Sequence, residues 1–361
     1  MITYKYQTNR VQLCPYSTKG SAFPNRQVNQ YYNSIIYPTF MCLKKTFRIF
    51  LLVIITPLVL RSADIPGIPQ GWSDGYAYAN SIRLHYYRAI PAPGKPIIVM
   101  AHGLSDNGLC WTTLTQKLQG QYDIYMVDTR GHGLSDPFTN TDDGATLVND
   151  LVDFVKVMKF NKPILMGHSM GAATVMRIGA EYPELASSII MLDPILRARA
   201  APAAASQPSS SNATTTTAVA TAPRASVPSS NRFGTPESMV AENNKSFKEL
   251  VERGHRQNPL WDSVDVKYWA LSKIQYHGPY TSVGANAMTG TMNIGNSLQM
   301  IKVPAIILKA DTSPESRKNN EELAKAMPKG RIVHVNGAGH NLHHDKLDQT
   351  TQLIKDFLSK L

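Results

Sequence analysis

Short apolar runs alternate with longer amphipathic runs from Gly75 to the end of the chain. The short runs have the length of β-strands, and several are rich in β-branched residues. The clearest amphipathic run is Ala145–Met158, where apolar residues recur at three- and four-residue spacing, which predicts a helix. Strands that alternate with helices and carry little charge on either face predict an α/β fold whose mostly parallel sheet is covered on both sides. The predicted strands are Ile82–Arg88, Pro96–Ala101, Asp123–Val127, Pro163–Met166, Ser187–Leu192, Pro304–Lys309 and Arg331–Val335.

The charge of the chain is unevenly distributed. The chain has 361 residues, of which 43% are hydrophobic, enough for one large core or two modest ones. Its net charge is +11, but residues 1–61 and 194–236 together hold twelve Lys and Arg residues and no acid. The rest of the chain is therefore close to neutral. A nucleic-acid partner needs a basic patch on the folded surface, so we expect no nucleic-acid partner.

The first of these basic segments has the pattern of an export signal. Residues 41–63 contain three basic residues, then the apolar run Ile49–Leu60, then Ser62 and Ala63. As a helix this run would cover about 18 Å, less than the ~30 Å of a bilayer core. The sequence predicts a leader over 1–63 that is removed on secretion or transfer to the periplasm, with Met41 as a candidate start. The alternative is a membrane anchor over residues 47–60, the only membrane contact we expect.

Residues 198–232 are expected to form a disordered insertion, because this stretch of Ala, Ser, Thr and Pro has few large apolar groups to bury. The following residues, 233–300, have a helical pattern and are predicted to form a cap. Within the cap, Trp261 and Trp269 are candidate substrate-binding residues. The α/β core is then expected in two parts, residues 64–197 and 301–361.

One serine occupies a turn between a predicted strand and a predicted helix. Ser169 lies in the pattern G-x-S-x-G at residues 167–171, after Pro163–Met166 and before Gly171–Ala180. Glycines on both sides allow a sharp backbone reversal that projects the side chain at the carboxyl end of the sheet, where active groups of such folds lie. The alternative is an ordinary strand-to-helix turn in which the serine caps the helix.

Other strand ends add residues of the same chemistry. The exit of Pro96–Ala101 reads His102-Gly103-Leu104, Asp311 follows Pro304–Lys309, and His340 follows the last strand after two glycines. A serine, an acid and a histidine in this chain order match one of the known nucleophile, acid and base arrangements.

With the motifs HGL, RGHGLSD, GHSMG and GAGH in this order, the chain resembles the α/β-hydrolase superfamily, in the esterase and lipase-like branch of lidded serine hydrolases. The resemblance implies an eight-stranded, mostly parallel sheet with a helical cap inserted between strands six and seven. It implies Ser169 as nucleophile, His340 as base and Asp311 as acid. The backbone N–H groups of Leu104 and Met170 would form the oxyanion hole. It implies no cofactor. We also expect no metal, because no second ligand cluster with zinc spacing accompanies His343, His344 and Asp345.

Asp193 is the alternative acid, because it also ends a strand within reach of the histidine loop. Asp311 is favoured since Pro194 fixes the chain after Asp193, whereas Asp311 lies in a Thr, Ser and Pro-rich loop. The family more often has a glycine before this aspartate, where this chain has Ala310. His343 and His344 are expected to be solvated.

These residues predict a serine hydrolase that cleaves a small or medium ester through an acyl-enzyme, in a monomer or dimer. Carbon–carbon hydrolysis and acyl transfer use the same triad, and a non-catalytic ligand receptor could use the same pocket. Epoxide hydrolases and dehalogenases need a carboxylate where Ser169 stands, so their chemistry is not expected.

Overall fold

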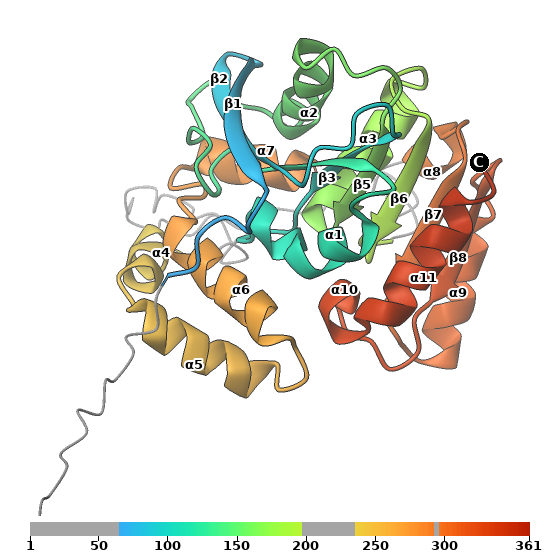
Figure 1. Ribbon diagram of the computed structural model, residues 1–361. Helices are drawn as coiled ribbons and strands as arrows, with labels where there is room; N and C mark the ends of the chain where they lie inside the picture. Colours follow the sequence, from blue (N-terminus) through green and yellow to red (C-terminus); the bar gives the residue numbers. More distant parts are fainter. Residues whose placement is uncertain (1–64, 197–234, 292–295) are drawn as a thin grey trace, which may run out of the picture. The chain divides into compact units, whose positions relative to one another are not determined.

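A computed structural model describes residues 65–196, 235–291 and 296–361 (Figure 1). The predicted leader and the predicted disordered insertion lie outside these residues. Within them, eight strands form one sheet in the order β1-β2-β4-β3-β5-β6-β7-β8. Only β2 runs antiparallel to its neighbours, and the other neighbouring pairs are parallel. The strands are β1 Ser73–Ala79, β2 Ile82–Arg88, β3 Ile97–Ala101, β4 Asp123–Val127, β5 Ile164–His168, β6 Ser188–Leu192, β7 Ala305–Lys309 and β8 Gly330–His334.

The predicted α/β class and mostly parallel sheet are confirmed. The central strands β4, β5 and β6 are buried along their whole length. Successive residues point to opposite faces, so Ile98 and Met100 belong to one apolar cluster and Val99 to the other. Helices cover both faces, which is why these strands read as continuous apolar runs.

The covering helices divide between the two faces. Those that contribute to the cluster of Val99 are α2 (Thr146–Val157), α3 (Met170–Glu181), α8 (Ser297–Met300) and α9 (Pro314–Ala324). The opposite cluster contains side chains of η1 (Gly108–Trp111), α1 (Thr112–Leu118), α10 (Leu342–Asp345) and α11 (Leu347–Leu358).

Strand β1 is absent from the sequence prediction. Its sequence, SDGYAYA, buries only Ala77 and Ala79, while Tyr76 and Tyr78 on its other face are exposed. As an edge strand paired with β2 alone, it needs no continuous apolar run. A pattern of small buried residues carries too little hydrophobic signal to be recognised as a strand.

Helices occupy the described part of the chain between β6 and β7. Helices α4, α5 and α6 lie together, whereas α7 packs against α2 and α3 (Figure 1). Their ranges are α4 Pro236–Asn243, α5 Phe247–Gln257, α6 Ser263–Gln275 and α7 Ser282–Thr291. Helix α5 begins at a capping box, in which Ser246 accepts from the N–H of Glu249 and Glu249 accepts from the N–H of Ser246.

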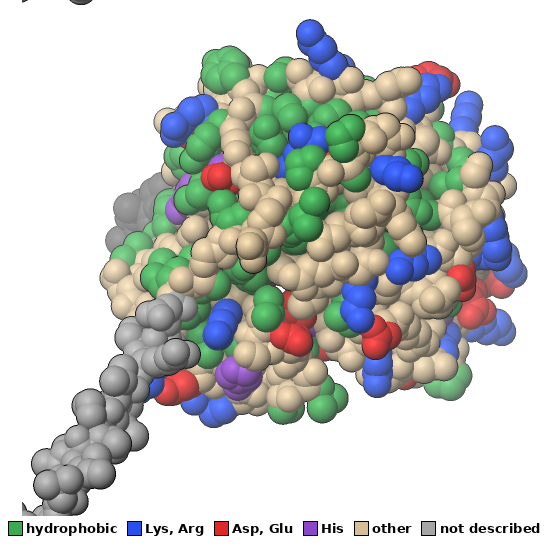
Figure 2. All heavy atoms as spheres, viewed as in Figure 1, with side chains coloured by type: hydrophobic (Ala, Val, Ile, Leu, Met, Phe, Trp, Pro, Cys, Tyr) green, Lys and Arg blue, Asp and Glu red, His purple; other side chains and the backbone are tan. Residues whose placement is uncertain are grey.

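No helix in the three described ranges has the length and apolarity needed to cross a membrane. Figure 2 shows Lys and Arg side chains distributed over the viewed face, with Asp, Glu and uncharged side chains between them.

Candidate active site

Ser169 lies in a strained turn between β5 and α3. Its backbone has φ 52° and ψ −108°, a conformation that residues with a side chain rarely adopt. A Cβ on Gly167 would lie 2.2 Å from the carbonyl oxygen of Gly171, and one on Gly171 would lie 2.1 Å from that of Ala101. Both glycines are therefore required by close backbone contacts, which accounts for the G-x-S-x-G pattern. The side chain of Ser169 makes no capping bond to α3, which excludes a role as an ordinary helix cap.

A second side chain meets the serine from the loop after β8. The Nε2 atom of His340 lies 2.9 Å from Oγ of Ser169. The imidazole is half exposed, with 50% of its side-chain surface accessible, so a ligand can reach it. The structure thus brings together Ser169 and His340, which are 171 residues apart in the chain.

The prediction that Asp311 orients His340 is wrong. The carboxylate that meets His340 is that of Asp193, whose Oδ2 lies 2.5 Å from Nδ1 of the imidazole. Asp311 instead accepts hydrogen bonds from Arg317 and from the N–H of Gly337, 2.7 Å away. It therefore fastens the loop that carries His340 without reaching the imidazole.

The backbone of Asp193 explains this assignment. Its φ of 46° is left-handed, so the chain reverses at the end of β6 and turns the carboxylate toward the neighbouring exit loop. The same carboxylate accepts from Nζ of Lys309 at 2.5 Å and from the N–H of Ala310 at 3.0 Å. Burial opposes its ionisation, but the His340 hydrogen bond and the charge of Lys309 prevail and lower the pKa of Asp193 to about 2. Asp193 is therefore ionised at neutral pH.

His168, which precedes the serine, supports the backbone of His340. Its Nε2–H donates to the carbonyl oxygen of His340 at 3.0 Å, while the side chain is buried. Desolvation, with a further contribution from the charge of His340, lowers the pKa of His168 to about 4. His168 is neutral at physiological pH, so it acts as a fixed hydrogen-bond donor.

Two further buried histidines tie the β3 and β4 exit loops together. Nε2 of His102 accepts from the N–H of Thr129 at 3.0 Å, and Nε2 of His132 accepts from the N–H of Ser105 at 3.1 Å. Both roles need a neutral ring, and burial lowers the pKa of both histidines. The HGL and RGHG motifs thus contribute to the shape of the loop that carries Leu104.

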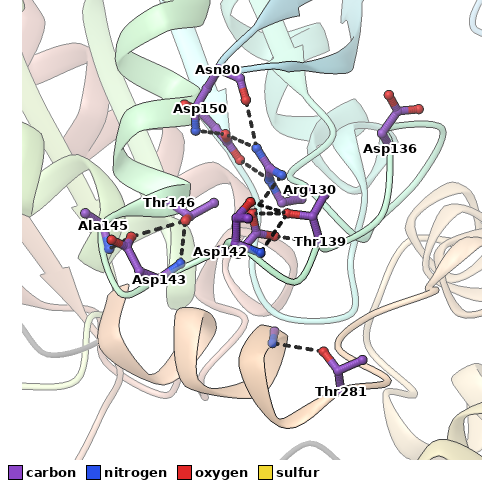
Figure 3. A network of polar contacts seen from close by, with 12 residues as sticks. Asn80, Arg130, Asp136, Thr139, Asp142, Asp143, Ala145, Thr146, Asp150 and Thr281 are labelled. Atoms are coloured by element: carbon purple, nitrogen blue, oxygen red, sulfur yellow. Dashed lines mark hydrogen bonds and ion pairs between the residues drawn. The ribbon is translucent and has the colours of Figure 1, made fainter.

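The arginine of the RGHGLSD motif forms the centre of a buried network (Figure 3). Arg130 makes a two-point contact with Asp150 of α2, at 2.9 and 2.7 Å, and donates to Asp142 at 3.0 Å. It also donates to the carbonyl oxygen of Asn80 in the β1–β2 turn. Burial raises the pKa of Asp150, and the arginine opposes that shift. The motif therefore stabilises the fold beside the site.

The predicted oxyanion-hole residues share one apolar cluster. Met170 is the first residue of α3 and is buried with Leu147 and Met288, and Leu104 packs against this cluster. The role of their N–H groups as oxyanion-hole donors remains a prediction. Gly103 beside them is tightly enclosed, since a Cβ there would lie 2.7 Å from Nδ1 of His168.

The two predicted substrate-binding tryptophans have different surroundings. Trp261 is buried and its indole N–H donates to Asp345 at 2.6 Å, and the other carboxylate oxygen accepts from the N–H of Gly339, next to His340. The ring of Trp269 makes cation–π contacts with Arg253 and Lys273. Contact with substrate stays a prediction for both tryptophans.

The expectation that His343 and His344 are solvated is wrong. Both are buried, His343 against Trp111 and His344 against Trp261, and Nδ1 of His344 lies 3.0 Å from Oδ2 of Asp265. Within residues 65–196, 235–291 and 296–361, no group of three or more His, Cys, Asp or Glu side chains is arranged to hold a metal ion.

The sequence was compared with a family profile and with curated proteins. The sequence profile of the Alpha/beta hydrolase family matches residues 98–353. Epoxide hydrolase 1 of Caenorhabditis elegans is 24% identical over 132 residues, which are 36% of this chain and 32% of that protein. A putative esterase/lipase of Haemophilus influenzae is 22% identical over 273 residues, which are 73% of this chain and 84% of the relative. The chain spans about a third of the length of the first curated relatives that it matches.

Solved structures share the fold. The crystal structure of E-2-(acetamidomethylene)succinate hydrolase superposes with a TM-score of 0.56 and 18% identity, over 80% of this chain and 99% of the other. Naproxen esterase of Bacillus subtilis superposes with a TM-score of 0.54 and 15% identity, over 80% of this chain and 91% of the other.

Proposed function

The chain belongs to the alpha/beta hydrolase family, and from this premise we propose that it is a serine hydrolase that cleaves a small or medium ester through an acyl-enzyme intermediate. One observation carries the proposal: the unbroken chain of contacts from Ser169 Oγ through both ring nitrogens of His340 to Asp193. This is the constellation that turns a serine hydroxyl into a nucleophile.

In the first step His340 Nε2 removes the proton of Ser169 as Oγ attacks the ester carbonyl. The bond between Oγ and the acyl carbon forms, and the imidazolium then gives its proton to the departing alkoxide as the ester bond breaks. In the second step His340 takes a proton from water, which attacks the acyl carbon. The imidazolium then gives that proton to Oγ of Ser169 as the acyl–Oγ bond breaks and the acid leaves. Asp193 holds the Nδ1–H tautomer and stabilises the imidazolium in both steps.

The developing negative charge on the carbonyl oxygen needs hydrogen-bond donors. We assign this role to the N–H groups of Leu104 and Met170, as the family resemblance implies. Support comes from the position of Met170 at the start of α3, where unpaired N–H groups favour an anion. Each such donor is worth roughly 3 kcal/mol of transition-state stabilisation in serine hydrolases.

The named activities of relatives leave the substrate open. They include an epoxide hydrolase, a putative esterase/lipase and an enzyme that acts on 2-(acetamidomethylene)succinate. Epoxide opening by the route of that group uses a carboxylate at the position of Ser169, so the serine favours acyl chemistry. Carbon–carbon hydrolysis and acyl transfer would use the same triad, and screening chromogenic esters of increasing chain length is the direct way to rank substrates.

A fluorophosphonate probe tests the proposal, because it labels only an activated serine. The wild-type protein should be labelled, and Ser169→Ala should not. The same two proteins are then assayed on p-nitrophenyl butyrate, with melting curves to show that both fold. A folded wild-type protein that resists the probe and leaves the ester intact would support a non-catalytic ligand receptor instead.

A further inference from the structure

The loop that carries His340, residues 335–341, is rich in glycine. It contains Gly337, whose φ of 69° is left-handed, and Gly339. Glycine leaves the backbone free to adopt many conformations, so the position of the imidazole depends on the hydrogen bonds that hold the loop. Asp311 accepts from the N–H of Gly337, and His168 donates to the carbonyl oxygen of His340. The N–H of Gly339, directly before His340, is held by a further carboxylate.

That carboxylate belongs to Asp345, the last residue of α10. Its Oδ2 accepts from the N–H of Gly339 at 2.8 Å. Its Oδ1 accepts from the indole N–H of Trp261 at 2.6 Å, although 84 residues separate the two in the chain. Hydrogen bonds to an ionised acceptor are stronger than those between neutral groups. One carboxylate therefore joins the backbone beside the proposed base to the predicted cap.

Trp261 lies in the turn between α5 and α6, which meets α10 (Figure 1). The side chain is buried. A second carboxylate fixes the same turn: Oδ2 of Asp265, in the first turn of α6, lies 3.0 Å from Nδ1 of His344. Asp265 also accepts from the hydroxyl of Thr113 in α1, at 2.8 Å. The indole N–H is therefore a donor in a fixed position.

A column of aromatic rings forms a second connection from Trp261 to His340. Adjacent ring centres are 4.1–4.8 Å apart in the order Trp261, His344, His343, His168 and His340. Burial lowers the pKa of both His168 and His343, so these two rings are uncharged at neutral pH. Closely packed side chains transmit a displacement to their neighbours, because the interior of a protein is barely compressible.

We propose that Trp261 is a positioning residue for His340 and acts through Asp345. By fixing that carboxylate it holds the N–H of Gly339, and the imidazole then keeps its Nε2 within 2.9 Å of Oγ of Ser169. The inference rests on the proposed ester hydrolysis. This role differs from the contact with substrate that the sequence suggests. A residue that contacts the substrate changes KM in a way that depends on the acyl group, whereas a positioning residue changes the rate of the chemical steps for every ester.

Two buried tryptophans provide a matched test. Trp261→Phe keeps an aromatic ring against His344 and removes the N–H donor. Trp72→Phe is the control, because Trp72 is 9% exposed, against 7% for Trp261, and its indole donates to Gln119 at the end of α1, at 2.9 Å. Each variant loses one buried hydrogen bond, so each should lower the melting temperature by a few degrees.

Only Trp261→Phe should also lower kcat, by about tenfold or more, on both p-nitrophenyl acetate and p-nitrophenyl hexanoate. Its KM should stay within about twofold of the wild-type value on both esters. The reason is that His340 acts in acylation and in deacylation, so that both steps slow together. Trp72→Phe should change neither kcat nor KM.

A double-mutant cycle tests whether Trp261 acts through Asp345. Asp345→Asn leaves one acceptor where there were two, and kcat should fall. Adding Trp261→Phe to Asp345→Asn should lower kcat by less than about twofold more, because the contact it removes is already broken.

Amide hydrogen exchange measures the loop without any substrate. Exchange in residues 335–341, followed by mass spectrometry, should be several-fold faster in Trp261→Phe than in the wild-type protein. It should be unchanged in Trp72→Phe.

The outcomes separate the two proposals. Ester hydrolysis with a change confined to KM in Trp261→Phe, an additive double variant or unchanged exchange in the loop would each overturn the positioning role and leave the hydrolase proposal intact. Faster exchange in the loop of Trp261→Phe, in a protein that hydrolyses no ester and resists the fluorophosphonate probe, would overturn the hydrolase proposal and retain the link between Trp261 and the His340 loop.

Discussion

At the scale of single residues, the backbone conformation of Asp193 determines which carboxylate meets His340. A positive φ at a non-glycine residue is not evident in sequence, and Pro194 after it suggested a turn leading away from the site. Asp311 is 38% exposed and is held by an arginine six residues later. Ser169 and His340 could be predicted because glycine patterns mark both of their turns. The acid could not, since both candidates end neighbouring strands.

Replacing each aspartate in turn tests the assignment. Asp193→Asn should reduce turnover by about 10⁴-fold, because an amide stabilises the wrong imidazole tautomer. Asp311→Asn should reduce turnover less than about tenfold, because its carboxylate supports a loop and does not touch the ring. Both variants are measured on one activated ester, with melting curves as the folding control. A larger loss at Asp311 would restore it as the acid.

The buried His168 predicts a pH dependence of stability. Its pKa falls from 6.5 when unfolded to about 4 when folded, so its stabilising effect is complete above pH 6.5 and is lost as pH falls through 4. His168→Gln removes this titration and keeps a donor for the His340 carbonyl. Between pH 7 and 4.5 the free energy of unfolding of the wild-type protein should fall by about 2.5 kcal/mol more than that of the variant. The free energy of unfolding is measured by urea titration at both pH values. An equal decrease in the wild-type protein and in His168→Gln would contradict the prediction.

At the scale of elements, the sheet was predicted best where strands are buried on both faces. Ile82–Arg88 and Asp123–Val127 have the predicted bounds, and Ala145–Met158 differs from α2 by one residue at each end. Strand β1 was missed because it lies at the edge of the sheet and buries only alanines. Hydrophobic periodicity in a sequence reflects which side chains are buried, so it does not reveal strands or helices that bury few large apolar side chains.

The turn between β5 and α3 gives a prediction for an element. Gly171→Ala places a methyl group against the carbonyl oxygens of Ala101 and His102, and backbone atoms in a central strand cannot move aside. We expect a loss of about 3 kcal/mol or more in the free energy of unfolding, together with misplacement of Ser169. Gly67→Ala is the control, since its added methyl group contacts nothing within 4 Å, and it should behave as the wild type in chemical denaturation.

At the scale of the whole molecule, the Arg130 network joins segments that are distant in sequence. It connects the β1–β2 turn, the β4 exit loop and α2 (Figure 3). Arg130→Met leaves Asp142 and Asp150 buried without their cation, so the free energy of unfolding should fall by about 3–5 kcal/mol. Arg83→Met, which breaks an exposed pair with Asp136, should leave the unfolding midpoint almost unchanged. Both variants are measured by thermal and urea unfolding. If Arg130→Met and Arg83→Met lower the free energy of unfolding equally, the buried network does not contribute more to stability than the exposed pair.

The neighbouring strands β6 and β7 have a consequence for how such a protein diversifies. Asp193 directly follows β6 and Lys309 ends β7, and the two strands are hydrogen-bonded partners although more than a hundred residues separate them in the chain. The acid, its lysine and the sheet register are therefore fixed by residues outside that long excursion. Under the proposed function, with this excursion as the predicted cap, exchanging it for one of different length would change the walls around the substrate while Asp193 and Lys309 keep their places, because closing a longer loop adds little entropy cost. Evolution could thus change which substrates enter the site without changing the reaction that the site catalyses.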